Sequence, residues 1–361
     1  MEFYKLQVKN IVKETPDTVS IYFDLSNEQR SHFSFSAGQY ITIKAEIDGN
    51  EIRRSYSLSN GIQEKELRIA VKRVTDGLMS NFLIDNVKIG DNLEVSQPDG
   101  KFSLTPSEEI RSHYFICAGS GITPIMSMIN TVLTEEPQSV CYLLYGSRDE
   151  NNIIYKKELD DLLKYHEGQL VVVHSLSKPL IEKKKGLGGL FSKGKINWDG
   201  EVGRIDRDKI TIFMRKNPGN KNNFFYLCGP GNLIDMAKSK LSQDGIDDSR
   251  VLSEYFSSGS APVNTNMGIA SGKIIVTIKG KTHEMDVVEG KSILDTMIDA
   301  KLDPPYSCTS GACSTCVAKI QRGTAEMHVC YALDEDEINE GLILTCQAVP
   351  TSEVLDVNFD V

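Results

Sequence analysis

The chain has 361 residues, of which 40% are hydrophobic, and a formal net charge of −10 at pH 7. This length predicts two or three domains, each large enough to bury its own core. No apolar run approaches a membrane span, and residues 1–5 lack the basic and apolar regions of a secretory signal. We therefore expect a globular protein with no membrane span and, given its acidic charge, no nucleic-acid partner.

The first hundred residues are β-rich. Short runs of alternating apolar and polar residues at 39–43 and 67–71 are separated by turn residues at 48–49 and 99–100. Many short strands with turns between them are typical of small antiparallel barrels. We expect such a barrel over residues 1–105.

Over residues 106–256 the pattern changes to strand, glycine turn and helix. Strands that alternate with helices form βαβ units and hence a parallel sheet. The sequence therefore predicts an α/β domain here. Its expected elements are strands 114–118, 141–145, 170–174 and 224–227, a turn at 119–121 and a helix at 124–133.

Two segments interrupt this organisation. Residues 183–195 hold five lysines, four glycines and no acid, so they are a poor helix and are expected to form a mobile surface loop. Residues 257–272 are small, polar and rich in Gly and Ser, which is linker composition.

The last segment, residues 273–361, carries most of the negative charge. From residue 271 onward there are 7 Lys and Arg against 15 Asp and Glu. A strand at 273–278, its hairpin partner at 281–288 and a helix at 292–300 capped by Ser292 are expected. The acidic surface is either a docking site for a basic partner or simply a solvated face.

Four cysteines of this segment have a diagnostic spacing. Cys308, Cys313 and Cys316 form C-x4-C-x2-C, and Cys346 follows at a distance, as in plant-type [2Fe–2S] proteins. Gly311 permits the tight turn of such a loop. A zinc site, the weaker alternative, usually pairs two close cysteines with a second close pair. We expect these four thiolates to ligate a [2Fe–2S] cluster.

Eight cysteines in all suit a reducing compartment when at least four must stay thiolates, so a cytoplasmic location is expected. Cys330 lies between the third and fourth ligands and is expected to be a small buried apolar residue.

The cluster segment resembles a plant-type ferredoxin along 305–316, 332–341 and 344–346. With the motifs upstream of it, the whole chain resembles the ferredoxin–NADP reductase superfamily, and among its members the reductases of oxygenases of the phenylacetyl-CoA epoxidase type. The resemblance implies a flavin-binding β-barrel, a nicotinamide-nucleotide domain and a β-grasp-like ferredoxin domain. The upstream motifs are residues 54–57, 77–80, 119–124 and 227–231.

The resemblance also implies how flavin binds. Tyr56 would lie against the isoalloxazine, Ser57 would hydrogen-bond near its N5, and Arg54 would pair with the phosphates. A helix that starts at Gly77 would direct its N–H groups and Ser80 at a pyrophosphate, which FAD has and FMN lacks. The expected FAD-binding residues are Arg54, Tyr56, Ser57, Gly77, Met79, Ser80 and Phe256.

For the nicotinamide nucleotide, the loop at 119–124 resembles the superfamily's pyrophosphate loop rather than the G-x-G-x-x-G fingerprint. In this resemblance Cys228 approaches the nicotinamide C4, and Ser57, Cys228 and Glu254 are the catalytic residues. The expected nucleotide-binding residues are Gly119, Gly121, Thr123, Pro124, Cys228, Gly229 and Pro230.

Ser147 and Arg148 follow a sheet strand and favour the 2′-phosphate of NADPH, whereas a carboxylate there would favour NADH. Acidic residues come directly after Arg148, so NADH remains the alternative nucleotide. Tyr155 and Lys156 are expected to add to this pocket.

We expect a reductase that passes electrons from NAD(P)H through FAD and the [2Fe–2S] cluster to an oxygenase. Two alternatives remain: a ferredoxin–NADP reductase fused to its own ferredoxin and serving a desaturase or hydroxylase, and a zinc-binding module. The acidic surface around residues 334–340 is expected to dock on a basic partner, and residues 183–195 to compete for it or to touch a second, acidic subunit.

Overall fold

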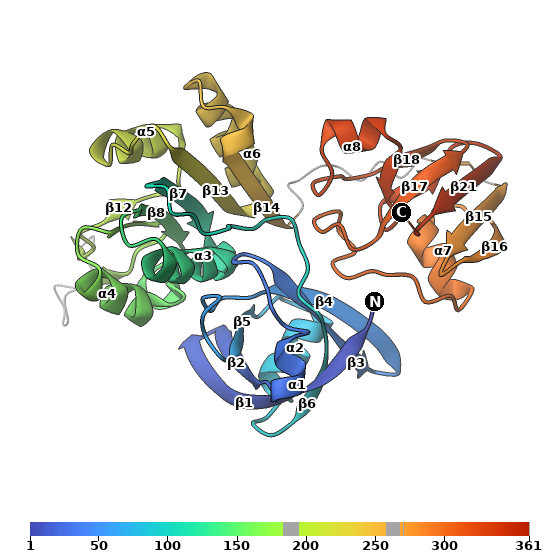
Figure 1. The fold of residues 1–361 in the computed structure, drawn as a ribbon, viewed down its shortest axis with the longest axis horizontal. Coiled ribbons are helices and arrows are strands. Elements are labelled where there is room, and N and C mark those ends of the chain that lie inside the picture. Colours follow the sequence, from blue (N-terminus) through green and yellow to red (C-terminus); the bar gives the residue numbers. More distant parts are fainter. Residues whose placement is uncertain (183–194, 258–267, 270, 361) are drawn as a thin grey trace, which may run out of the picture.

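The computed structural model describes residues 1–182, 195–257, 268–269 and 271–360, which form three lobes (Figure 1). Nearly all of the lysine-rich segment and most of the expected linker lie outside the described residues. Among the described helices, none is both long and apolar enough to cross a bilayer.

The N-terminal lobe is the predicted antiparallel barrel. Its sheet has the order β4-β3-β6-β1-β2-β5. A bridge between Leu58 and Ile69 and a hydrogen bond from Ser59 N to Arg68 O (2.8 Å) close it between β4 and β5. The elements are β1 (Phe3–Thr15), β2 (Thr18–Asp24), α1 (Asn27–Arg30), β3 (Tyr40–Ile47), β4 (Asn50–Ser57), β5 (Leu67–Lys72), α2 (Leu78–Asp85) and β6 (Asn92–Ser96).

The central lobe is the predicted parallel sheet, in the order β12-β9-β8-β7-β13-β14. Helices α3 and α4 pack on one face and α5 and α6 on the other. The strand order reverses between β7 and β13, which is where such sheets bind ligands. The elements are β7 (Ser112–Ala118), α3 (Ile122–Glu135), β8 (Val140–Ser147), α4 (Lys156–Tyr165), β9 (Leu170–Leu176), β12 (Glu201–Val202), α5 (Arg207–Lys216), β13 (Asn223–Pro230), α6 (Gly231–Gln243) and β14 (Val251–Ser257).

Helix α3 begins at Ile122 rather than at Pro124, where the sequence predicts it. The expected glycine turn is a short 3₁₀ helix, η1 (Gly119–Gly121), that runs directly into α3. Pro124 is tolerated inside the first turn because the N–H groups there have no intrahelical partner.

The C-terminal lobe is a mixed sheet in the order β16-β15-β21-β17-β19, as expected for a β-grasp-like ferredoxin domain. The predicted cap Ser292 begins α7 in a capping box with Asp295. The elements are β15 (Lys273–Ile278), β16 (Lys281–Asp286), α7 (Ile293–Asp299), β17 (Val317–Arg322), β18 (Ala325–Met327), α8 (Glu335–Asn339), β19 (Leu342–Leu344), β20 (Ala348–Pro350) and β21 (Val354–Asn358). The short strands β10 (Ile181–Glu182) and β11 (Lys195–Ile196) and the 3₁₀ turns η2 (Glu150–Asn152) and η4 (Asp248–Arg250) belong to the central lobe.

Buried polar contacts join the barrel to the central lobe. Arg68 of β5 makes two hydrogen bonds to Glu158 of α4, at 2.7 and 3.0 Å. The Tyr155 hydroxyl donates to Ser59 Oγ (2.8 Å), and the Arg68 guanidinium lies 4.7 Å from the Tyr155 ring. Tyr155 is therefore a buried interface residue, so the expectation that it adds to a nucleotide pocket is wrong. Lys156 instead pairs with Asp160 on α4.

Candidate functional site

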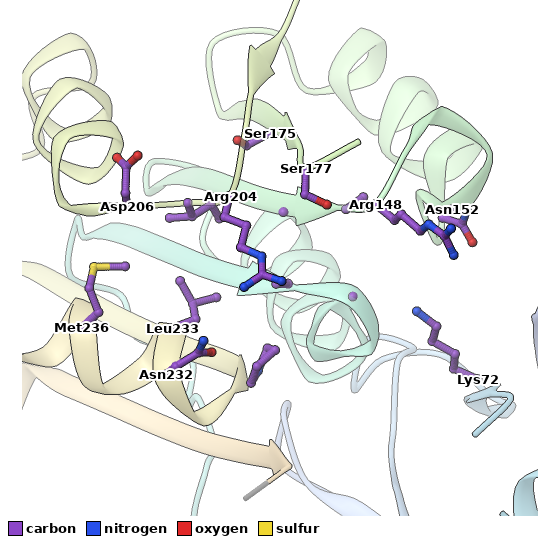
Figure 2. Close-up of a pocket in the computed structure, with 16 residues that line it drawn as sticks. Lys72, Arg148, Asn152, Ser175, Ser177, Arg204, Asp206, Asn232, Leu233 and Met236 are labelled. Atoms are coloured by element: carbon purple, nitrogen blue, oxygen red, sulfur yellow. The ribbon is translucent and has the colours of Figure 1, made fainter. Parts of the chain in front are cut away.

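A cavity of about 490 Å³ opens at the carboxyl ends of the central strands, at the point where the strand order reverses (Figure 2). Of the residues predicted to bind the nucleotide, it is lined by Gly119 after β7, Ser147 and Arg148 at the end of β8, and Pro230 at the end of β13. The sequence therefore brings residues from three βα connections to one cavity.

Two arginines meet this cavity. Arg148 stands at its rim with 71% of its side chain exposed, and its Nε lies 3.9 Å from Asp149 Oδ2. Figure 2 shows the Arg204 guanidinium reaching over the cavity from the connection between β12 and α5. Sequence reasoning missed Arg204, because no motif marks that connection. Ser147 beside Arg148 is buried.

A second cavity of about 450 Å³ lies where all three lobes meet. Its walls include five of the residues predicted to bind flavin or nucleotide, and Lys72 lines both cavities, so the two are neighbours. Tyr40, Lys72, Arg73 and Val74 also line it and were missed, because no local pattern reveals which lobe covers a strand or the turn after it. The predicted flavin and nucleotide residues in its walls are Tyr56, Ser57, Thr123, Glu254 and Phe256, and the predicted cluster ligands there are Cys308 and Cys313.

Glu254 of β14 has an unusual environment in this second cavity. Its Oε2 is buried and has no hydrogen-bond partner among the described residues. Burial raises the pKa of Glu254 to about 8; the nearby Cys308 raises it too, while a hydrogen bond from Ser57 opposes the shift. The carboxyl therefore carries its proton at neutral pH and can donate or hold a hydrogen bond beside a ligand.

Close backbone packing separates the two cavities. A Cβ on Gly121 would lie 2.3 Å from Cys228 O, so only glycine fits there. Gly229 has φ of 147°, and a Cβ there would lie 3.2 Å from the backbone of Ala118. Cys228 is fully buried beneath this loop, and burial raises the pKa of its thiol well above the ordinary value.

Several residues that were predicted to bind flavin or nucleotide do not line either cavity. Gly77 caps the N-terminus of α2, and Ser80 Oγ accepts from Val74 N (3.1 Å) and donates to Gly77 O (3.3 Å). Met79 is in the barrel core, and Arg54 Nη1 donates to Arg53 O (2.6 Å). Among the described residues predicted to bind flavin or nucleotide, those that line neither cavity are Arg54, Gly77, Met79, Ser80, Gly121, Pro124, Cys228 and Gly229.

The four predicted cluster cysteines converge in two pairs. Cys313 hydrogen-bonds Cys308 and lowers its pKa, and Cys316 does the same for Cys346. Gly311, which lies between Cys308 and Cys313 in the sequence, has φ of 73°, and a Cβ there would lie 2.7 Å from Val329 O.

This arrangement fits a two-iron cluster, in which each iron takes two thiolates. Within the described residues, no group of three or more His, Cys, Asp or Glu side chains is set to hold one metal ion.

The two pairs differ in what covers them. Cys308 and Cys313 line the second cavity, whereas Cys316 and Cys346 pack in an apolar cluster of the C-terminal lobe. The first pair is therefore the edge that faces the barrel.

Comparison with known protein families finds three matches in chain order. Residues 5–104 match the oxidoreductase FAD-binding domain, residues 115–239 the oxidoreductase NAD-binding domain, and residues 276–351 the 2Fe-2S iron-sulfur cluster binding domain.

Curated relatives align with this chain over nearly their full length. The chain is 31% identical to one subunit of the 1,2-phenylacetyl-CoA epoxidase of Escherichia coli (strain K12), with 99% of this chain and 98% of the relative aligned. It is 32% identical to the ferredoxin reductase component of 3-ketosteroid-9-alpha-monooxygenase of Rhodococcus rhodochrous, over 98% and 96%.

Solved structures share the fold. Phthalate dioxygenase reductase superposes with a TM-score of 0.63 at 24% identity, over 99% of this chain and 98% of that one. A type IV self-sufficient cytochrome P450 monooxygenase superposes with a TM-score of 0.68 at 20% identity, over 98% of this chain and 41% of that one.

Proposed function

The chain belongs to the family of oxygenase reductases that join FAD-binding, NAD-binding and 2Fe-2S domains, and we propose that it draws its electrons from NADPH and serves a phenylacetyl-CoA epoxidase-type oxygenase in the cytoplasm. A bound FAD supplies hydride acceptance and a bound [2Fe–2S] cluster supplies single-electron transfer. The residues of this chain orient these groups and keep water away from them.

For the flavin, Tyr56 would cover the ring and Arg54 would neutralise the phosphates. The start of α2 at Gly77 and Ser80 would direct backbone N–H groups at the pyrophosphate. The buried, protonated Glu254, with Ser57 on its carboxyl, would hold a proton near the flavin ring.

For the nucleotide, Pro230 at the end of β13 would contact the nicotinamide, and Cys228 and Gly229, which line neither cavity, would support this floor from beneath. Ser147, Arg148 and Arg204 would hold the 2′-phosphate that distinguishes NADPH from NADH. Two guanidinium groups favour a phosphate over a ribose diol, because an arginine has only donors to offer.

One observation carries the proposal: a single cavity is bounded by Tyr56 of the barrel, Thr123 and Glu254 of the central lobe, and the cluster cysteines Cys308 and Cys313. A flavin in that cavity can meet a nicotinamide on one side and the cluster on the other.

The test is anaerobic titration of the purified protein with NADPH and with NADH, followed by visible absorption and EPR spectroscopy. We expect NADPH to bleach the flavin band and produce the EPR signal of a reduced [2Fe–2S] cluster at lower concentration than NADH. Turnover is then measured with the purified oxygenase component of a phenylacetyl-CoA epoxidase and with that of a steroid hydroxylase. If only the steroid hydroxylase component supports turnover, the chain would instead serve a steroid monooxygenase, like its Rhodococcus rhodochrous relative.

A further inference from the structure

Strand β4 presents different chemistry on its two faces. Side chains alternate along a strand, so Arg54 and Tyr56 share one face and Arg53, Ser55 and Ser57 share the other. The first face carries the predicted flavin contacts Arg54 and Tyr56. On the second face only Ser57 was predicted to bind a cofactor, whereas Arg53 and Ser55 meet the cluster loop of the C-terminal lobe.

Arg53 is the centre of this contact. Its side chain is only 7% exposed, although it carries a permanent charge. Within the barrel it pairs with Glu51, through Nε at 2.8 Å. Toward the C-terminal lobe, Nη2 donates to Asp303 Oδ1 (2.8 Å) and Nη1 to Pro304 O (3.3 Å), and the guanidinium lies 4.6 Å from the centre of the Tyr306 ring.

Hydroxyl groups continue the contact along the hairpin of β3 and β4. Thr42 and Ser55 face each other across the hairpin. Thr42 Oγ1 donates to Ser307 Oγ (3.1 Å), and Ser55 Oγ lies 2.5 Å from the same atom. Ser307 is 1% exposed and directly precedes the first cluster ligand, Cys308.

Tyr40, two pairs further along the hairpin and on the same face, contacts the other end of the cluster loop. Its hydroxyl lies 2.9 Å from Thr315 Oγ1, between the ligands Cys313 and Cys316 in sequence. The tyrosine is 4% exposed and lines the second cavity. The hairpin therefore holds both flanks of the loop that presents Cys308 and Cys313 to that cavity.

We propose that this face is a dock for the cluster loop and that Arg53 is a positioning residue for electron transfer from flavin to cluster. The inference rests on the function proposed above. In the step that it concerns, the reduced flavin loses one electron and one ferric iron becomes ferrous, with no covalent bond made or broken; NADPH supplies the electrons. Transfer at this point depends on placement, because electron transfer needs the flavin and the cluster to be held close together.

Arg53 is buried in this pair, whereas the Asp303 side chain is 56% exposed. Removing one partner of a hydrogen-bonded charge pair that is buried on one side should mainly increase the rate at which the two surfaces separate. In Arg53→Gln, the cluster loop should therefore be docked on the barrel for a smaller fraction of the time. Arg53→Lys keeps the charge but loses the two-pronged donor geometry and the contact with Tyr306, so it should fall between wild type and Arg53→Gln.

The test is anaerobic stopped-flow spectroscopy of the full chain with both groups bound. Flavin reduction by NADPH should stay within about twofold of wild type in Arg53→Gln, while cluster reduction should slow by about tenfold or more. Asp303→Asn, on the other lobe, should slow cluster reduction in the same way, and the double variant should be no slower than the worse single variant. Lys9→Gln, which breaks an exposed ion pair with Glu66 elsewhere on the barrel, is the matched control and should behave as wild type.

A second readout does not depend on turnover. Hydrogen–deuterium exchange of backbone amides in residues 303–316 should accelerate in Arg53→Gln and Asp303→Asn but not in Lys9→Gln, with the EPR spectrum of the reduced cluster unchanged. Wild-type cluster reduction in both Arg53→Gln and Asp303→Asn would overturn the dock. If Arg53→Gln fails to retain its flavin, the rate of cluster reduction in Asp303→Asn alone tests the dock. A wild-type protein whose cluster NADPH fails to reduce would instead overturn the proposed function.

Discussion

Cluster ligation depends on single residues, and Cys313 is the proposed ligand that pairs with Cys308 and lines the second cavity. Cys313→Ser should abolish the EPR signal of the reduced cluster but leave FAD content and NADPH-dependent ferricyanide reduction intact, because most of the wall of the second cavity, and all of the wall of the first, come from the other two lobes. Cys330→Ser is the control. Its sulfur makes only a weak contact, 4.0 Å from Leu333 O, so it should keep the cluster. A normal reduced-cluster signal from Cys313→Ser would show that this residue is not a ligand.

Nucleotide choice is also a property of individual side chains. Arg148→Ala should weaken NADPH binding by about 1.5–3 kcal/mol, the range for losing a hydrogen bond to a charged group, and leave NADH nearly unchanged. Because Arg148 is largely exposed, the lower end is expected, and Arg204→Ala should act in the same direction.

Binding constants for both nucleotides, measured by flavin-difference titration, check the prediction for each arginine. An equal loss of NADPH and NADH affinity would assign the arginine to a part of the nucleotide that both share.

Residue-level prediction from sequence works where a motif is local and fails where a cavity wall is assembled by tertiary contact. The cysteines are set by their spacing, and Ser57 and Glu254 follow from the resemblance. Arg204 and Tyr40 carry no local pattern; they reach their cavities because β12 joins the sheet edge and β3 pairs with β4.

Elements were predicted best where periodicity and caps agree. The four predicted parallel strands of the central sheet and α7, with its Ser292 cap, appear where expected, whereas β12 and β14 were not predicted. The start of α3 was displaced because a 3₁₀ turn merges with the helix, and closure of the barrel through Leu58 and Ile69 is a long-range pairing that no local pattern encodes.

The loop between β7 and α3 tolerates no added volume at Gly121, where a Cβ would lie 2.3 Å from the backbone oxygen of Cys228. Gly121→Ala should push this loop away from β13. The expected result is loss of stability by about 1–3 kcal/mol, typical of overpacking, and slower flavin reduction by NADPH with FAD still bound. Gly119→Ala is an informative comparison, because its Cβ would meet nothing within 4 Å but its φ of 59° adds backbone strain. Unchanged hydride transfer in Gly121→Ala would contradict the close packing.

A buried polar cluster holds the end of α3 to the sheet. Glu136, which ends the helix, is 2% exposed; it accepts a hydrogen bond from His113 Nε2 (3.0 Å) and pairs with Arg111. Burial alone would raise the pKa of Glu136, but the hydrogen bonds from His113, Arg111 and Ser139 outweigh it and lower the pKa to about 2. Burial lowers the pKa of His113, so His113 is neutral at neutral pH.

Because the folded pKa of Glu136 is depressed, its carboxylate stabilises the fold fully above its unfolded pKa of about 4.5, and this contribution is lost as pH falls toward about 2. Glu136→Gln should lower the free energy of unfolding by about 3 kcal/mol at pH 7, since it leaves Arg111 buried without its charge partner. Urea unfolding at pH 7 and pH 4 should show the difference from wild type shrinking at the lower pH. A constant difference would mean that the charge of Glu136 contributes nothing.

At the scale of the whole molecule, each of the three lobes contacts both of the others. The barrel and the central lobe share the Arg68–Glu158 pair and the buried Tyr155, and they are continuous in the chain. The C-terminal lobe meets the barrel through the dock around Arg53 and the ion pair of Lys101 with Glu337, and it meets the central lobe through the stacked rings of Tyr255 and Tyr331 at 4.3 Å. The order of the three lobes follows from motif order in the sequence, whereas the docked arrangement does not, since it depends on side chains that face across domains.

The acidic C-terminal lobe gives a final prediction, on salt. Helix α8 presents Glu335 and Asp336 near an exposed Ile338, and Glu337 of the same helix is already paired with Lys101 of the barrel. Exposed charge pairs contribute about 0–1 kcal/mol each and are screened beyond about 8 Å at physiological salt. Electron delivery to a basic oxygenase partner should therefore fall as salt rises, while flavin reduction by NADPH should not.

The double variant Glu335→Gln/Asp336→Asn should weaken that salt dependence in turnover assays with the purified partner. The control is Glu284→Gln, which removes an exposed acid on the distant strand β16 and should leave the salt dependence of turnover unchanged. Cluster reduction within the chain should respond to salt less than partner turnover does, because the Arg53 side of the dock is buried and poorly screened. Partner turnover that is insensitive to salt, in wild type and variant alike, would mean that the negative charge around α8 is a solvated surface without a docking role.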